Sequence, residues 1–165
     1  ASEMCIETDL RVAGITGTNG KTPTAFLLAQ ASDFLGRRGW YIGTLGHGHP
    51  GGVREAGLTT PDAVTVQRRL AEARDEGAST LGLEVSSHAL DQDRVACVNF
   101  DTALFPHLTP APLTYHSTPA AYAAAKARLF HTPGLLEPSS TCHIRSTATH
   151  SRASLPPPVS SSTPR

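Results

Sequence analysis

Short apolar runs alternate with amphipathic segments along the first 130 residues of the chain. The runs have the length and composition of buried strands, and the segments between them repeat apolar residues at helical spacing. The predicted strands are residues 10–15, 40–45, 80–85 and 98–105. The predicted helices are residues 22–35, 61–77 and 118–130. Strands separated by helices call for βαβ units, so the pattern predicts an α/β fold with a mostly parallel sheet.

Threonine, proline and glycine mark the expected ends of these elements. Thr60 before Pro61, and Thr118 before Pro119, each place a hydroxyl N-cap ahead of a proline at the first helical position. Glycines crowd residues 43–52, so we expect the stretch that follows the strand at 40–45 to form a loop.

The composition changes after Phe130. Residues 131–165 are dominated by serine, threonine and proline, including the runs at 156–158 and 160–162. Apolar side chains are too sparse there to offset the entropy of ordering the backbone, so we predict one domain at residues 1–130 and a disordered tail at 131–165. A proline-rich ligand for a partner domain is the weaker alternative, because no motif surrounds the prolines.

Composition excludes several classes of partner. The 14 basic residues balance the 14 acidic ones, so there is no general attraction to nucleic acid or to an anionic membrane. No apolar run approaches the roughly 20 residues that span a bilayer. Three scattered cysteines without metal-binding or disulfide spacing fit a reducing compartment. We therefore expect a soluble, cytoplasmic protein.

The clearest chemical signal lies between the first predicted strand and the first predicted helix. It consists of Gly17, Thr18, Asn19, Gly20, Lys21 and Thr22. Glycines let successive backbone N–H groups face one concavity, and the helix N-terminus adds a favourable dipole for phosphate. Lys21 would contribute positive charge and Thr22 a hydroxyl for Mg²⁺. A strict P-loop has glycine where this chain has Ile15, so an ordinary glycine-rich turn with a surface lysine is the alternative.

Four segments together carry a family resemblance. Residues 14–22, 41–45 (YIGTL), 58–62 (LTTPD) and 84–90 (EVSSHAL) resemble, in this order, the Mur ligases that act as UDP-N-acetylmuramoyl-tripeptide synthetases. The first segment is also similar to folylpolyglutamate synthetases, whereas LTTPD with EVSSHAL is specific. The resemblance covers about residues 11–130 and implies the first part of a central ATPase domain, with P-loop-type topology and an incomplete sheet.

The resemblance also implies a reaction and its partners. Members of the family use ATP and Mg²⁺ to phosphorylate the terminal carboxylate of UDP-MurNAc-L-Ala-D-Glu. The amine of diaminopimelate or lysine then attacks the acyl phosphate, which adds the third residue of the peptidoglycan stem peptide. A cytoplasmic monomer is implied, and residues 17–22 would hold ATP.

Three residues take catalytic or metal-binding roles under this resemblance. Lys21 would neutralise phosphate charge, and Glu84, at a strand end on the sheet edge of the phosphate loop, would bind Mg²⁺ with Thr22. Lys126 would be carbamoylated by CO₂ and would help place the metal. Without the resemblance, Glu84 is a solvated carboxylate and Lys126 a solvated lysine on an alanine-rich helix. The residues matching substrate contacts are Thr59, Thr60, Ser86, Gln92 and Arg94.

The sequence also departs from the family pattern. Ala111 and Pro112 stand where the family has an aspartate and a metal-site histidine, and neither can bind metal. Beyond Phe130 the resemblance ends, and the family's N- and C-terminal domains have no counterpart in this sequence. We therefore expect the chain alone to be inactive as a ligase. A non-catalytic nucleotide-binding remnant, or a fragment similar to folylpolyglutamate synthetase, is the alternative.

Overall fold

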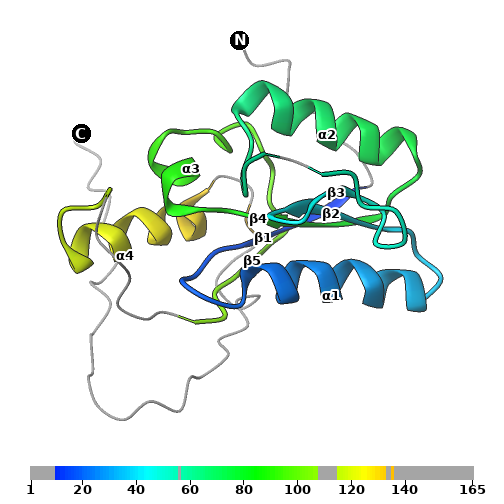
Figure 1. Cartoon of the computed structure of the whole chain (residues 1–165), viewed down its shortest axis with the longest axis horizontal. Coiled ribbons are helices and arrows are strands. Elements are labelled where there is room, and N and C mark those ends of the chain that lie inside the picture. Colours follow the sequence, from blue (N-terminus) through cyan, green and yellow to red (C-terminus); the bar gives the residue numbers. More distant parts are fainter. Residues whose placement is uncertain (1–9, 56, 108–114, 133–134, 136–165) are drawn as a thin grey trace, which may run out of the picture.

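Residues 10–55, 57–107, 115–132 and 135 are described by a computed structural model, in which a five-stranded sheet carries helices on both faces (Figure 1). The strands are β1 (Arg11–Ile15), β2 (Gly39–Gly43), β3 (Gly46–Gly48), β4 (Thr80–Glu84) and β5 (Thr102–Leu104). The helices are α1 (Lys21–Phe34), α2 (Ala63–Asp75), α3 (Ser87–Asp91), α4 (Pro119–Ala127) and the 3₁₀ turn η1 (Arg128–His131).

The sheet has the order β3-β2-β4-β1-β5. β4 pairs in parallel with both β2 and β1, and β1 pairs in parallel with β5. This confirms the predicted α/β fold with a mostly parallel sheet. β3 is antiparallel to β2, so the prediction of a loop was wrong at residues 46–48. Glycine there serves a tight hairpin: Gly46 and Gly48 adopt positive φ while their backbones pair with β2.

The two faces of the sheet bury different helices (Figure 1). Val66, Leu70 and Ala73 of α2 are buried on one face, in the larger apolar cluster. α1 covers the other face with alanines, and a Cβ on Gly82 of β4 would lie 2.5 Å from the carbonyl oxygen of Ala25. α1 thus packs at backbone distance on the sheet, which fixes the loop that precedes it.

Two helix starts were predicted from threonine and proline, and one of them is correct. Thr118 caps α4 by accepting a hydrogen bond from the backbone N–H of Ala121 at 3.1 Å. α2 instead begins after Asp62, whose carboxylate accepts from Thr65 N at 3.0 Å. Thr60 is no cap because its hydroxyl is used elsewhere, as described below. The short helix α3 was not predicted, since five residues show no periodicity.

The end of the described chain packs on the core. η1 continues α4, and Leu135 lies partly buried against the larger apolar cluster. Most of the segment predicted to be a disordered tail, 133–134 and 136–165, lies outside the described residues. No helix in the described part of the chain has the length and apolarity to cross a membrane.

Candidate functional site

The phosphate-loop candidate and Glu84 lie at one edge of the sheet. Ile15 ends β1 and is in register with Glu84, which ends β4. The loop from Thr16 to Gly20 then leads into α1, which starts at Lys21. The predicted neighbourhood of this loop and Glu84 is thus present in the fold, because β1 and β4 are parallel neighbours.

The backbone of the loop is held against the segment that follows β5. Thr16 N donates to Leu104 O at 3.0 Å, and Thr18 N donates to His107 O at 2.8 Å. Gly17 and Gly20 adopt φ values of 143° and 84°, which favour glycine. Gly20 is the N-cap of α1 and supplies no capping side chain. The amides at the start of α1 are therefore not covered by a side-chain cap.

Two lysines from different helices converge on this loop. Lys21 Nζ donates to Gly17 O at 3.0 Å and to Thr18 O at 3.2 Å. Lys126 Nζ, from α4, donates to Gly17 O at 2.8 Å. Burial lowers the pKa of Lys21, and the carboxylate of Glu84 opposes that shift. The site thus gathers two ammonium groups on one carbonyl oxygen.

Lys126 is buried, with 2% of its surface exposed, so the alternative of a solvated lysine is wrong. Burial, and then the charge of Lys21, lower its pKa to about 8. The ring of Tyr122 lies 4.6 Å from Lys126 Nζ, and the Tyr122 hydroxyl lies 3.3 Å from Thr18 Oγ1. Tyr122 lies one helical turn before Lys126 on α4, but no pattern in the sequence shows that this face of α4 meets the phosphate loop.

Glu84 is completely buried, so the alternative of a solvated carboxylate is also wrong. Its Oε2 accepts from Thr22 Oγ1 at 3.0 Å and from Thr44 Oγ1 at 3.2 Å. Its Oε1 accepts from Thr44 N at 3.0 Å and from the hydroxyl of Tyr41. The sequence did not assign a role to Tyr41 or Thr44, which reach Glu84 from the neighbouring strand and its turn.

Hydrogen bonds link the five residues that the resemblance assigns to substrate to Glu84, to its partner Thr44 or to one another. Thr59 Oγ1 lies 3.1 Å from Thr44 Oγ1. Thr60 Oγ1 donates to Glu84 O at 2.8 Å and accepts from Ser86 N at 3.0 Å, so this hydroxyl joins two loops.

Ser86, Gln92 and Arg94 complete that group. The Ser86 hydroxyl caps α3 by accepting from Ala89 N at 3.1 Å. Arg94 donates to Thr60 O at 3.0 Å and to the side-chain oxygen of Gln92. The guanidinium therefore ties the segment after α3 to the threonine loop, and both border the same sheet edge.

The donors at this edge fit Mg²⁺ and phosphate. Thr22 and Glu84 offer a hydroxyl and a carboxylate, the oxygen ligands that Mg²⁺ prefers, and Mg²⁺ commonly completes its shell with water and substrate phosphates. Within the described residues, no cluster of three or more histidines, cysteines, aspartates or glutamates could hold a metal by itself. Ala111 and Pro112, where the sequence departs from the family, lie outside the described residues.

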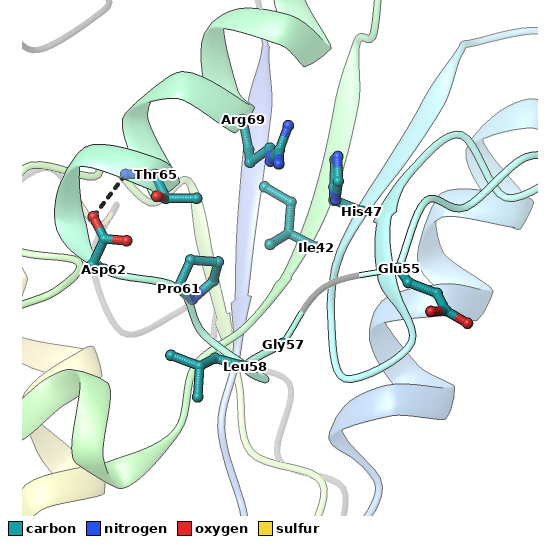
Figure 2. A pocket seen from close by; sticks show the side chains of 9 residues that line it. All are labelled: Ile42, His47, Glu55, Gly57, Leu58, Pro61, Asp62, Thr65 and Arg69. Atoms are coloured by element: carbon teal, nitrogen blue, oxygen red, sulfur yellow. Dashed lines mark hydrogen bonds between the residues drawn. The ribbon is translucent and has the colours of Figure 1, made fainter.

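An open cavity of about 370 Å³ lies on the α2 side of the threonine loop (Figure 2). Pro61 and Asp62 line it from the helix start, and His47 and Arg69 lie near each other at one end (Figure 2). Burial lowers the pKa of His47. Both ring nitrogens of His47 are shielded from solvent, so they present no accessible polar group to the cavity.

Most of the chain, including the residues of this site, is similar to proteins of known family. A family model described as the Mur ligase middle domain matches residues 15–137, which extends past Phe130. The UDP-N-acetylmuramoyl-L-alanyl-D-glutamate–2,6-diaminopimelate ligase of Xanthomonas oryzae pv. oryzae (strain MAFF 311018) is 52% identical over 126 residues, which are 76% of this chain and 26% of that protein. The protein of the same name from Pseudomonas aeruginosa is 51% identical over the same shares.

A solved structure carries the same protein name. It matches with a TM-score of 0.67 and 37% sequence identity, over 76% of this chain and 25% of that one. The chain thus spans about a quarter of the length of the curated relatives that it matches.

Proposed function

The chain belongs to the Mur ligase family, and we propose that it forms the nucleotide-binding part of an ATP-dependent ligase that extends the peptide of a peptidoglycan precursor. The single observation that carries this proposal is the geometry of one sheet edge. There, Lys21 and the N-terminus of α1 flank a buried carboxylate, Glu84, which is bonded to Thr22. Cationic, amide and carboxylate groups in this arrangement suit a magnesium-bound polyphosphate.

The proposed substrates follow from the printed names of the relatives. These proteins are ligases of UDP-N-acetylmuramoyl-L-alanyl-D-glutamate and 2,6-diaminopimelate. We propose the same acceptor for the protein to which this segment contributes, with diaminopimelate as the incoming amino acid and lysine as the alternative. We also propose a cytoplasmic monomer.

The phosphate loop, residues 17–22, would hold ATP through backbone amides at the start of α1 that no side chain caps. Lys21 would leave the carbonyls of Gly17 and Thr18 to meet the outer phosphates, and Thr22 with Glu84 would hold Mg²⁺. When bound, ATP supplies the phosphoryl group that activates the carboxylate of the acceptor, and Mg²⁺ neutralises its charge. The burial of Glu84 keeps its carboxylate in one orientation beside the loop.

Lys126 would contribute a carbamate. Carbamoylation by CO₂ needs a neutral amine, and burial beside Lys21 lowers the pKa of Lys126 to about 8. Roughly a tenth of the amine is therefore neutral near pH 7, far more than for a lysine with the ordinary pKa. The carbamate would place an anion next to Gly17, where it would add a third protein oxygen ligand for Mg²⁺ to those of Thr22 and Glu84.

The acceptor would bind across the threonine loop and the segment after α3. Thr59, Thr60 and Ser86 supply hydroxyls there, and Gln92 and Arg94 supply an amide and a guanidinium. A guanidinium and clustered hydroxyls are suited to carboxylate and phosphate groups. Thr60 and Ser86 use their hydroxyls within the protein, so we propose that they shape this surface for the acceptor.

Isothermal titration with a non-hydrolysable ATP analogue and Mg²⁺ tests the proposal. The chain should bind the analogue, and Lys21→Ala should weaken binding by at least tenfold. Arg37→Ala, which removes a charge from the exposed turn after α1, should bind as the unmodified chain does. Equal affinity of the unmodified chain and Lys21→Ala would sink the proposal. Substrate-dependent ADP release by the chain alone would show that ligation chemistry, and not only nucleotide binding, resides in this segment.

A further inference from the structure

Tyr41 is a buried phenol whose hydroxyl lies in the candidate site. Its side chain is completely buried in β2, and its ring meets the ring of Phe26 edge-on at a centroid distance of 5.4 Å. The hydroxyl donates to Glu84 Oε1 and accepts from Leu45 N at 3.2 Å. The phenol therefore uses its one donor and one acceptor position at the carboxyl edge of the sheet.

The two oxygens of Glu84 have chemically different partners. Oε1 accepts from Tyr41 and from the backbone N–H of Thr44, and neither donor can move away without disturbing β2 or its turn. Oε2 accepts from the hydroxyls of Thr22 and Thr44, which can rotate about one bond. A metal ion can therefore approach Oε2 if two hydroxyl groups reorient. Approach to Oε1 would break its hydrogen bonds to Tyr41 and to the backbone of Thr44.

The packing around Gly43 enforces this difference. A Cβ at Gly43 would collide with Glu84 Oε1 and with the Tyr41 hydroxyl. Glycine thus lets the backbone of β2 lie directly against this hydrogen bond. No room remains there for another ligand of Oε1.

The contacts of Tyr41 also reach the threonine loop. By accepting from Leu45 N, the phenol fixes the turn that carries Thr44. Thr44 in turn bonds both oxygens of Glu84 and contacts Thr59 Oγ1 at 3.1 Å. One buried hydroxyl therefore orients the carboxylate and the turn that links it to the proposed acceptor surface.

We propose that Tyr41 is a positioning residue for the magnesium site: its hydroxyl fixes Glu84 Oε1 and directs Oε2 toward Thr22 and the phosphate loop. This inference rests on the proposed function, which assigns Mg²⁺ to Glu84 and Thr22. Residues that orient a metal ligand typically change metal affinity by about 10- to 100-fold when they are removed. A phenol that only filled the core would not affect metal dependence.

Tyr41→Phe tests the proposal, because it keeps the ring against Phe26 and removes only the hydroxyl. The measured quantity is the ratio of affinities for the ATP analogue with and without Mg²⁺. Glu84→Gln serves as the reference for a lost metal ligand. Tyr115→Phe is the matched control, since it removes a phenol hydroxyl that bonds Asp91 at the surface. Circular dichroism of each variant establishes that it is folded.

We expect Tyr41→Phe to lower the ratio by about tenfold while affinity without Mg²⁺ stays within about twofold of the unmodified chain. Glu84→Gln should bring the ratio close to one, and Tyr115→Phe should leave it at the value of the unmodified chain. A Tyr41→Phe ratio equal to that of the unmodified chain, or equal weakening with and without Mg²⁺, overturns the inference alone. An unchanged ratio in Glu84→Gln overturns the metal assignment of the proposed function, and the inference with it.

A spectroscopic readout keeps the test independent of nucleotide affinity. Mg²⁺ at Oε2 withdraws charge from the carboxylate and weakens its hydrogen bond to the phenol. Adding Mg²⁺ and the analogue should therefore produce a tyrosine ultraviolet difference spectrum in the unmodified chain and in Tyr115→Phe. The comparison is made in a Tyr122→Phe background, because the Tyr122 hydroxyl lies on Thr18 of the phosphate loop and would report nucleotide binding by itself. In that background the signal should be absent after Tyr41→Phe, and its persistence there would contradict the inference.

Discussion

Lys126, on α4, donates a buried hydrogen bond of 2.8 Å to the carbonyl oxygen of Gly17, more than a hundred residues away in the chain. Lys21 donates to the same oxygen from the first turn of α1. The phosphate loop is therefore held by ammonium groups from two helices. Any change in the charge of Lys126 acts directly on the loop.

Lys126 should form a carbamate in bicarbonate buffer. Its lowered pKa leaves a reactive neutral amine near neutral pH, and Lys21 is the only other lysine. With ¹³C-labelled bicarbonate, the unmodified chain and Lys21→Ala should show a carbamate resonance by NMR. Lys126→Met should lack it, apart from any signal of the N-terminal amine. A resonance that survives in Lys126→Met would assign the carbamate elsewhere.

The stability of the chain should rise with pH because of Lys126. Below about pH 8 the ammonium is charged in both folded and unfolded states, and the folded state bears the full cost of burying it. Between about pH 8 and the ordinary value of 10.5, the unfolded chain binds more protons, so the free energy of unfolding increases with pH. The gain from this group is at most about 3 kcal/mol.

Urea unfolding of the unmodified chain and of Lys126→Met, in CO₂-free buffer without Mg²⁺, measures this effect. The difference between the two free energies of unfolding should change by roughly 1–3 kcal/mol from about pH 7 to about pH 10. Tyr41, whose pKa is raised by burial and by Glu84, titrates with the opposite sign, but it is common to both proteins and cancels. A difference that is constant with pH would contradict the assigned pKa shift.

Helix α2 should depend on Asp62 and not on Thr60 for its cap. Asp62→Ala should lower the free energy of unfolding by about 1 kcal/mol, because the N–H of Thr65 loses its partner. Thr60→Val should cost more, about 1–3 kcal/mol, since it leaves Glu84 O and Ser86 N without their buried partner. Urea denaturation ranks the two variants. A negligible cost of Asp62→Ala would contradict its role as the cap, and a Thr60→Val cost below that of Asp62→Ala would contradict the buried bonds of Thr60.

The sequence predicted which segments meet at the sheet edge, but not the side-chain hydrogen bonds formed there. Glu84 could be placed beside the phosphate loop because the carboxyl ends of parallel strands meet at one edge. Its bond to Tyr41 could not be predicted, since it depends on the register of β2 against β4, where Tyr41 lies opposite Gly82. Local periodicity shows that a strand exists and not how far it slides along its neighbour.

The same limit explains the error at residues 46–48 and why the residues alone favoured a solvent-exposed Lys126. Glycine-rich composition indicates a turn, but whether the chain returns along β2 depends on the length of that turn. An alanine-rich helix with one lysine reads as solvent-exposed, yet α4 presents that lysine to the loop after β1. In both cases the contact joins two segments, and only the folded structure shows that these segments lie side by side.

Substituting Gly43 should damage the site and the fold together. In Gly43→Ala the new methyl group would collide with Glu84 Oε1 and the Tyr41 hydroxyl, both of which are completely buried. Relief requires moving the carboxylate or bending β2, which should lower the free energy of unfolding by about 1–3 kcal/mol. It should also reduce the Mg²⁺ dependence of nucleotide binding. Gly52→Ala is the matched control, because no atom lies within 4 Å of its added Cβ. If urea denaturation gives the same stability for both variants, the close packing of β2 against Glu84 is wrong.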